Sequence, residues 1–251
     1  QDGDLFPLPG VVDGETEVTL PQPMLKDMIA KTEFAIAQDD MREVLTGCYL
    51  EIKAGKATMV ALDGYRMALV KNDVSDVESS LSAIIPGRAV GDIGKLLKDG
   101  QDDFCTLSFQ QNRLHINLMG TDIYVVLVEG EYIDYRRILP TQFATVLKAD
   151  LETLRRCVDR AALIAREGSN NLVKFRMEDG RLFIESNSEI GDVHEEMDAE
   201  QEGNDLTISF NVKYMLDVVR NIEAERVEMC FNTAVTPCVV TPEGNRDYLH
   251  L

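Results

Sequence analysis

The sequence predicts an α+β protein made of two copies of one domain, each copy with two helices packed on antiparallel β-sheets. Three observations indicate this fold: four segments have helical spacing of apolar residues, strand-like segments lie between them, and the order of elements occurs twice. A chain of 251 residues is long enough for two domains of ordinary size, each with its own core.

Four segments repeat apolar residues at the spacing of an amphipathic helix, namely 24–38, 88–98, 149–167 and 211–224. Asn211 is a candidate N-cap for the last of them, because its side chain can accept a hydrogen bond from a free amide of the first turn. The residues expected to face the core of that helix are Met215, Val218, Val219 and Ile222.

Strand-like segments fill most of the chain between the helices. Segments 48–53 and 57–62 flank Ala54-Gly55, and segments 173–176 and 182–186 flank Asp179-Gly180, so each pair predicts a hairpin. Further strand-like segments predict meanders late in each half, at 104–109, 113–118, 123–128, 227–231 and 238–240.

The order helix, hairpin, strand, helix, meander occurs twice. Gly55 with Gly180, and Arg88 with Lys213, have the same offset of 125 residues. The offset is 127 for Ala30 with Cys157 and 122 for Phe109 with Phe231, so it is nearly constant across helices, turn and meander. A nearly constant offset indicates a duplicated domain. We place the boundary near Leu139-Pro140, which gives domains 15–139 and 140–251.

The cysteines and histidines give no sign of a metal site. The five cysteines lack C-x-x-C spacing, which favours buried reduced thiols over a zinc site or a disulfide framework. The three histidines are scattered, and each is interpreted as a strand residue. We therefore expect no cofactor. Charged residues interrupt every apolar segment, so the sequence predicts a cytoplasmic protein with no membrane partner.

The charge distribution differs between helices and strands. The net charge is −19, yet the four predicted helices hold 11 of the 25 basic residues and only 9 of the 44 acidic ones. A protein whose helices face phosphates and whose exterior is acidic would show this pattern. The attraction between its helices and the phosphates would be weak, sequence-independent and salt-sensitive. Solvated helix faces would produce it equally well, because Lys and Arg are good helix formers.

Three motifs carry a resemblance to a known family. They are D-G-Y-R-M-A at 63–68, D-Y-R-R-I-L-P at 134–140 and F-N-V-K-Y-M-L-D at 210–217. All three, in this order, resemble segments of the beta sliding clamp, the beta subunit of bacterial DNA polymerase III. The similarity extends from about Glu15 to the end of the chain.

The resemblance implies a fold and a function. In that family each subunit has three like domains, and two subunits close head to tail into a ring around duplex DNA. The spacing here matches the second and third domains, so the first domain and the usual C-terminal tail are expected to be missing. Residues 1–14 are expected to be the remnant of the exit from the first domain, which Asp4-Leu5-Phe6-Pro7 resembles. The implied function is that of a non-catalytic processivity factor, which tethers the replicative polymerase and repair proteins through short peptides and is loaded by a clamp loader.

The resemblance also implies three sets of site residues. The partner-peptide cleft would be lined by Leu45, Leu62, Gly64, Tyr65, Arg66, Met67, Ile133, Arg137, Ile138, Val235, Pro237 and Leu251. The DNA-facing cations would be Arg42, Arg88, Lys95, Lys98, Arg155, Arg156 and Lys213. The subunit interface would include Leu163 and Ile164, although ordinary core positions explain these two residues equally well from sequence.

Two other classes of function remain as alternatives. Asp63, Asp134 and Arg137 suggest an enzyme, but the sequence has no P-loop, nucleophile elbow, metal-binding pair or dinucleotide fingerprint. A β-rich interaction scaffold without a DNA role is the stronger alternative. It predicts no salt-sensitive DNA association even in an assembled ring. As a structural alternative, Asp63-Gly64 is an ordinary turn and Tyr135-Arg136-Arg137 an ordinary linker.

Overall fold

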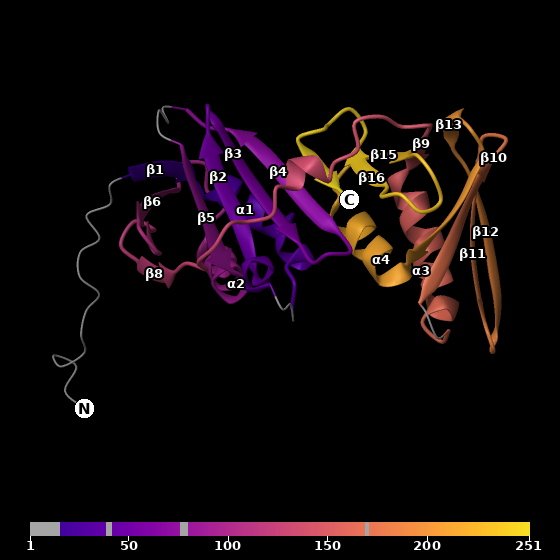
Figure 1. Cartoon of the computed structure of the whole chain (residues 1–251), viewed down its shortest axis with the longest axis horizontal. Coiled ribbons are helices and arrows are strands. Elements are labelled where there is room, and N and C mark those ends of the chain that lie inside the picture. Colours follow the sequence, from indigo (N-terminus) through magenta and orange to yellow (C-terminus); the bar gives the residue numbers. More distant parts are fainter. Residues whose placement is uncertain (1–15, 39–41, 76–79, 169–170) are drawn as a thin grey trace. The chain divides into compact units, whose positions relative to one another are not determined.

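The computed structural model describes residues 16–38, 42–75, 80–168 and 171–251 (Figure 1). The chain divides into two compact units, Gln1–Ile133 (unit 1) and Asp134–Leu251 (unit 2). The predicted exit segment 1–14 lies outside the described residues, and the predicted boundary near Leu139-Pro140 stays a prediction.

Unit 1 contains two antiparallel sheets. The first has four strands in the order β1 (Thr16–Pro21), β6 (Phe104–Gln110), β7 (Arg113–Asn117) and β8 (Asp122–Val126). The second has the order β4 (Met67–Asp73), β3 (Lys56–Leu62), β2 (Gly47–Lys53) and β5 (Leu81–Pro86).

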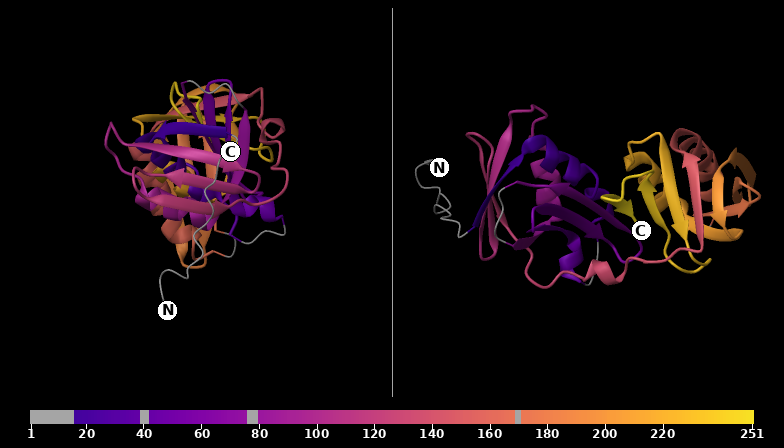
Figure 2. Two further views of the ribbon diagram at one scale, coloured as in Figure 1. Left: turned by 90° about the vertical axis from the view of Figure 1, so that its left-hand side faces the viewer. Right: turned by 90° about the horizontal axis from the view of Figure 1, so that it is seen from above.

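The helices of unit 1 connect its two sheets. Helices α1 (Gln22–Ala30) and α2 (Gly87–Leu96) contact each other, and α1 contacts both β1 and β4, which belong to different sheets (Figure 2). Two short 3₁₀ turns complete the unit, η2 (Glu33–Ala35) and η3 (Glu43–Thr46). The apolar faces of α1 and α2 are buried at Leu25, Met28, Ile29, Val90 and Ile93, and these side chains form the core between the helices and the sheets.

Unit 2 repeats this arrangement. One of its sheets has the order β12 (Gly191–Asp198), β11 (Arg181–Ser188), β10 (Leu172–Glu178) and β14 (Leu206–Asn211). The other has the order β13 (Glu200–Gly203), β9 (Thr145–Asp150), β15 (Arg226–Phe231), β16 (Val239–Pro242) and β17 (Tyr248–His250). Helix α3 (Leu151–Ala165) lies along β10, β11 and β12, and α4 (Val212–Asn221) packs beside α3 (Figure 1). A 3₁₀ turn, η4 (Tyr135–Arg137), opens the unit.

The predicted α+β fold and its duplication are confirmed. The pairing order β1-β6-β7-β8 in unit 1 corresponds to β9-β15-β16-β17 in unit 2, and β4-β3-β2-β5 corresponds to β12-β11-β10-β14. The two predicted hairpin turns also match. Ala54 and Gly55 have φ of 51° and 73°, and Asp179 and Gly180 have φ of 52° and 75°. Two successive positive φ angles are the signature of the type I′ turn, which suits the twist of a hairpin.

The first predicted helix is too long. The segment 24–38 was expected to be one helix, but α1 ends at Ala30 and a separate 3₁₀ turn follows. Thr32, with φ of −128°, is outside the helical range, and its hydroxyl donates a 2.8 Å hydrogen bond to the carbonyl of Met28. A threonine hydroxyl that competes with backbone amides for a carbonyl weakens helix continuation, so the apolar spacing beyond it belongs to a different element.

The expected helix cap, the expected buried thiols and the expected strand positions of the histidines are confirmed. Asn211 caps α4 by accepting a 2.9 Å hydrogen bond from the amide of Lys213, and the four predicted core residues of α4 are buried. All five cysteines are free and buried, and the three histidines lie in β7, β12 and β17. Among the described residues, no helix is both long enough and apolar enough to cross a membrane. That part of the chain also contains no cluster of His, Cys, Asp and Glu arranged to hold a metal ion.

Candidate partner and nucleic-acid interfaces

The first predicted site segment is a tight turn between β3 and β4. One carboxylate oxygen of Asp63 accepts hydrogen bonds from the amides of Tyr65 and Arg66, each 3.0 Å long. Gly64 has φ of +87°, in the left-handed region that a residue with a Cβ rarely adopts. The turn therefore holds Tyr65 outward, where its side chain is 82% exposed.

Arg66 ties this turn to unit 1. Its Nε lies 3.0 Å from Asp63 Oδ2, its Nη2 donates a 2.7 Å hydrogen bond to the carbonyl of Phe34, and its guanidinium lies 5.5 Å from the centre of the Phe34 ring. The side chain is only 12% exposed. A buried guanidinium with these partners fixes the turn against the η2 segment. Asp63-Gly64 is thus a turn, as the structural alternative expected, and it also positions the proposed cleft residues.

The other proposed cleft residues of unit 1 differ in exposure. Leu45, Leu62 and Met67 are buried, whereas Ile133 is half-buried. Arg42, proposed for DNA, is exposed, and a Cβ added at Gly64 would lie 3.6 Å from its Nη2. The buried leucine and methionine side chains expose almost no apolar area, so Tyr65 offers the largest open apolar surface of this set.

The proposed cleft residues of unit 2 are mostly exposed. Val235 is 93% exposed in a loop closed by a 2.9 Å hydrogen bond from the amide of Thr233 to the hydroxyl of Thr236. Pro237 and Ile138 are exposed, and Leu251 is half-buried. Arg137 is exposed and forms a 3.0 Å ion pair with Asp134.

The motif that contains Arg137 also anchors the start of unit 2. Tyr135 is buried, and the guanidinium of Arg136 lies 4.6 Å from the centre of its ring. This packing fits the structural alternative for Tyr135-Arg136-Arg137, an ordinary linker, and it leaves the side chains of Ile138 and Arg137 on the surface.

Three of the proposed DNA-facing cations are engaged within the protein. Arg155 donates to the carbonyl of Val219 from Nε and Nη2, at 3.1 and 3.0 Å, and so joins α3 to the end of α4. Arg156 forms a 2.9 Å ion pair with Glu152, and Lys95 forms one of 3.1 Å with Asp92. Exposed pairs of this kind are weak and open readily, whereas Arg155 is held by the backbone.

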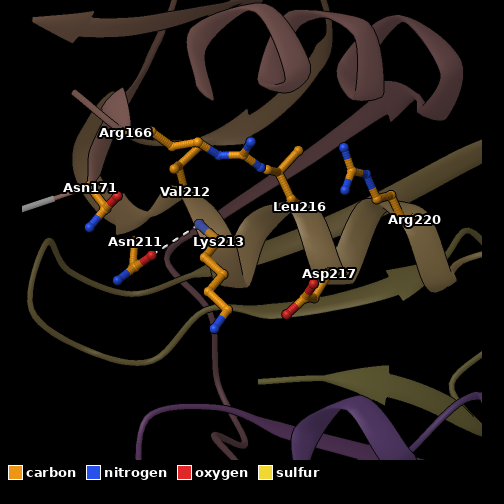
Figure 3. A pocket seen from close by; sticks show the side chains of 8 residues that line it. All are labelled: Arg166, Asn171, Asn211, Val212, Lys213, Leu216, Asp217 and Arg220. Atoms are coloured by element: carbon orange, nitrogen blue, oxygen red, sulfur yellow. Dashed lines mark hydrogen bonds between the residues drawn. The ribbon is translucent and has the colours of Figure 1, made fainter. Parts of the chain in front are cut away.

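Three other proposed cations are exposed and form no ion pair with a described residue. Arg88, Lys98 and Lys213 have no side-chain ion pair within the described ranges. Two further cations, Arg166 and Arg220, were not proposed from the sequence, yet they line a hollow with Lys213 beside α4 (Figure 3). Arg166 lies at the end of α3 and Arg220 near the end of α4, so no motif in the sequence joins them.

The two proposed interface residues lie near the end of α3. Leu163 is 67% exposed and Ile164 is half-buried. An exposed leucine on a helix that otherwise buries its apolar residues is not a core position, which removes that alternative for Leu163.

Comparison with known proteins identifies the class of this fold. The family model of the DNA polymerase III beta subunit central domain matches residues 19–134, and that of its C-terminal domain matches residues 136–251. The solved DNA polymerase sliding clamp of Bacillus subtilis covers 100% of this chain with a TM-score of 0.95 and 28% identity. The fold is therefore that of the sliding clamps.

The same matches, together with curated relatives, identify the family to which this chain belongs. A beta sliding clamp from Staphylococcus aureus is 35% identical over 246 residues, which are 97% of this chain and 65% of that protein. A Pseudomonas aeruginosa clamp solved with bound griselimycin covers 98% of this chain, with a TM-score of 0.92 and 27% identity. The chain belongs to the DNA polymerase III beta subunit family, and it spans about 65% of the length of its curated relatives.

Proposed function

We propose that the chain acts as the central and C-terminal domains of a non-catalytic DNA sliding clamp. The observation that carries this proposal is the match of two consecutive family domains, in order, over residues 19–134 and 136–251. In this function the protein encircles duplex DNA as a head-to-tail homodimeric ring, loaded by a clamp loader in the cytoplasm. It tethers the replicative polymerase and repair proteins.

The DNA contacts of the proposed clamp are weak and sequence-independent. Exposed cations with no internal partner, such as Arg88, Lys98 and Lys213, attract phosphates without reading bases. Topological enclosure would keep the ring on DNA, so strong direct affinity is not needed. The rest of the chain is acidic, and its negative charge limits nonspecific binding of phosphates to the other surfaces of the protein.

The partner site of the proposed clamp is an apolar surface for short extended peptides. Tyr65 in unit 1 and Val235, Pro237 and Ile138 in unit 2 supply exposed apolar area next to backbone that is fixed by turns. A few apolar anchors supply most of the affinity in peptide recognition of this kind. Leu and Phe side chains of a clamp-binding peptide are the expected anchors.

A peptide titration tests the proposed partner site. A fluorescent peptide with a Gln-x-x-Leu-Phe-like sequence is titrated with the chain and with the variants Tyr65→Ala and Val235→Ala. Loss of an anchor contact is expected to weaken binding by about tenfold or more. Both residues are exposed, so neither variant should unfold the protein. Met67→Ala is a poorer choice because Met67 is buried and its loss would leave a cavity.

Tyr124→Ala is the matched control, because Tyr124 is an exposed tyrosine on the edge strand β8, outside the proposed site. It should leave peptide affinity unchanged. Saturable binding that survives both site variants would contradict the cleft assignment. The interaction scaffold would then be favoured if an assembled ring also showed no salt-sensitive association with DNA.

A further inference from the structure

Residues 127–133, here called the strap, follow β8 and end at Ile133, one of the proposed cleft residues. The amide of Val128 donates a 2.9 Å hydrogen bond to the carbonyl of Ile84 in β5. Gly130 passes close to η3, because a Cβ added at this glycine would lie only 2.8 Å from Cγ1 of Val44. The strap therefore contacts the second sheet of unit 1 and the η3 turn before it reaches Ile133.

The side chain of Tyr132 anchors the last part of the strap. Within the described ranges, no backbone group of residues 129–133 forms a hydrogen bond with another backbone group. The ring of Tyr132 stacks on that of Tyr49 in β2, with the ring centroids 5.0 Å apart and the planes 9° apart. Its hydroxyl donates a 3.4 Å hydrogen bond to the carbonyl of Val60 in β3. Tyr132 thus makes the hydrogen-bonded contact that lies nearest to Ile133 along the strap.

The phenol of Tyr132 takes the place of a strand partner beside β3. Strand β3 pairs with β4 as far as Leu62, but its pairing with β2 ends at Val60, opposite Tyr49. Residues two apart in a strand point their backbone groups to the same side, so Val60 and Leu62 offer an acceptor and a donor to one partner. The phenol oxygen donates to Val60 and accepts a backbone hydrogen bond from Leu62. Tyr132 therefore extends the pairing of β3 beyond the point where β2 departs from it.

Burial keeps this phenol in its neutral form. Removal from water raises the pKa of the Tyr132 hydroxyl above its ordinary value of 10.0, because a phenolate would be poorly solvated there. The hydroxyl therefore stays a hydrogen-bond donor to Val60 throughout the neutral pH range. A ring that is stacked on one side and hydrogen-bonded to two backbone groups has a single favourable position, and the strap backbone next to it is held with it.

This anchor lies beside two proposed cleft residues. Leu62 is the last residue of β3 and directly precedes the Asp63 turn, and Ile133 directly follows Tyr132. Leu62 is buried, whereas the half-buried Ile133 keeps apolar area open to solvent. Since Ile133 has no backbone hydrogen bond of its own within the described ranges, its position depends on the neighbouring Tyr132.

We propose that Tyr132, held by its stack on Tyr49, is a positioning residue of the partner-peptide site and fixes Ile133 so that its side chain presents apolar area to a bound peptide. This inference rests on the proposed clamp function and adds to it two residues that act through Ile133 without touching the peptide. An anchor that is already in place before binding lowers the entropic cost of ordering the site, so it raises affinity.

A double-mutant cycle in the whole chain tests this role, with the dissociation constant of a fluorescent Gln-x-x-Leu-Phe-like peptide as the readout. Ile133→Ala should weaken binding by about tenfold, as expected for the loss of one apolar anchor. Tyr132→Ala should weaken binding by a similar factor, because Ile133 is no longer held. The double variant Tyr132→Ala/Ile133→Ala should bind no worse than Ile133→Ala, since Tyr132 acts only through Ile133. Tyr132→Phe keeps the stack and loses only the hydroxyl, so it should weaken binding less than Tyr132→Ala does.

Tyr124→Leu is the matched control. It breaks a similar stack, that of Tyr124 with His115 at 4.7 Å, in the first sheet of unit 1, which carries no proposed cleft residue. Urea denaturation should show that Tyr132→Ala and Tyr124→Leu both lower the free energy of unfolding. Only Tyr132→Ala should lower the peptide affinity of the folded protein. If Tyr132→Ala does not fold, Tyr49→Leu replaces it in the cycle with the same expected result.

The possible outcomes separate the role of the strap from the proposed function. Unchanged peptide affinity in the folded Tyr132 variants overturns the positioning role and leaves the partner site standing. A loss of about a hundredfold in the double variant would show that Tyr132 and Ile133 act independently, and it also overturns the positioning role. Failure of the unaltered chain to bind the peptide contradicts the proposed partner site, and the role of the strap falls with it.

Discussion

Arg155 donates two hydrogen bonds to one backbone oxygen, the carbonyl of Val219, from Nε at 3.1 Å and from Nη2 at 3.0 Å. Nη2 also lies 3.4 Å from the carbonyl of Ile222. The last carbonyls of a helix have no partner within the helix, and a cation near them is favoured by the helix dipole. Arg155 therefore closes the end of α4 from the neighbouring helix α3.

We predict that Arg155→Lys destabilises unit 2 while it leaves DNA affinity nearly unchanged. Lysine keeps the charge but has no planar fork, so the two hydrogen bonds to Val219 are lost. The expected decrease in the free energy of unfolding is about 1–2 kcal/mol, measured by urea denaturation. Arg156→Lys is the control, because Arg156 is exposed and pairs only with Glu152. A drop in DNA affinity without loss of stability would contradict this prediction and would indicate that Arg155 contacts DNA.

The cap of α3 makes the stability of unit 2 depend on pH. Asp150 accepts a 2.7 Å hydrogen bond from the amide of Thr153, and hydrogen bonding by the Thr153 side chain and amide lowers the pKa of its carboxyl. A lowered pKa in the folded state stabilises the fold above the pKa of the unfolded chain, near 3.8. That contribution is lost as the pH falls through the folded pKa.

We predict that Asp150→Asn keeps most of the stability at pH 7 and reduces its loss between pH 5 and pH 2, because asparagine caps without titrating in this range. Asp150→Ala should lower the free energy of unfolding at pH 7 by about 1 kcal/mol. Thermal unfolding of the three proteins across this pH range provides the measurement. Equal acid sensitivity of the unaltered protein and the Asn variant would show that other carboxylates dominate.

The sequence was most informative where local chemistry decides the structure. Gly55 and Gly180 occupy matching turn positions because a type I′ hairpin requires positive φ, which glycine adopts readily. The two glycines lie 125 residues apart, so the same turn could be predicted in both halves of the chain. Asn211 was assigned as a cap on the same kind of local argument, and the helices keep their expected apolar faces. Each of these features depends on a few neighbouring residues.

Features that depend on distant residues could not be predicted. The end of α1 is set by the hydroxyl of Thr32, although the apolar spacing continues past it. Strand β13 has the sequence Glu-Gln-Glu-Gly, with no apolar alternation, and exists because β9 is available to pair with it. Arg166 and Lys213 meet only through the packing of α3 beside α4. Burial of Leu45, Leu62 and Met67 likewise follows from the folded unit rather than from the motifs that contain them.

The buried thiols give a prediction about chemical reactivity. Burial raises the pKa of the Cys48 thiol from 9.0 to about 12 and that of Cys105 to about 11. Alkylation requires the thiolate, so both residues should resist iodoacetamide at pH 8 in the folded protein and react in urea. Mass spectrometry of digested samples identifies each modified cysteine. Stability should also fall above pH 9, where the unfolded chain loses thiol protons that the folded protein keeps. Rapid native modification of Cys48 would contradict the buried position.

The turn that presents Tyr65 gives the last prediction. Asp63 accepts hydrogen bonds from the amides of Tyr65 and Arg66 through one oxygen, while its other oxygen lies 3.0 Å from Arg66 Nε. Asp63→Ala removes all three interactions and leaves the guanidinium of Arg66 without its carboxylate. We expect the free energy of unfolding to fall by about 2 kcal/mol and peptide affinity to fall with it, because Tyr65 is no longer held outward.

Asp63→Asn separates the two parts of this interaction. Asparagine retains the oxygen that accepts from the two amides, so the turn and peptide affinity should survive, while the ion pair with Arg66 is lost and stability falls. Peptide titration and urea denaturation of both variants give the two readouts. If Asp63→Ala lowered stability but bound the peptide as well as the unaltered protein does, the orientation of Tyr65 would not depend on this turn.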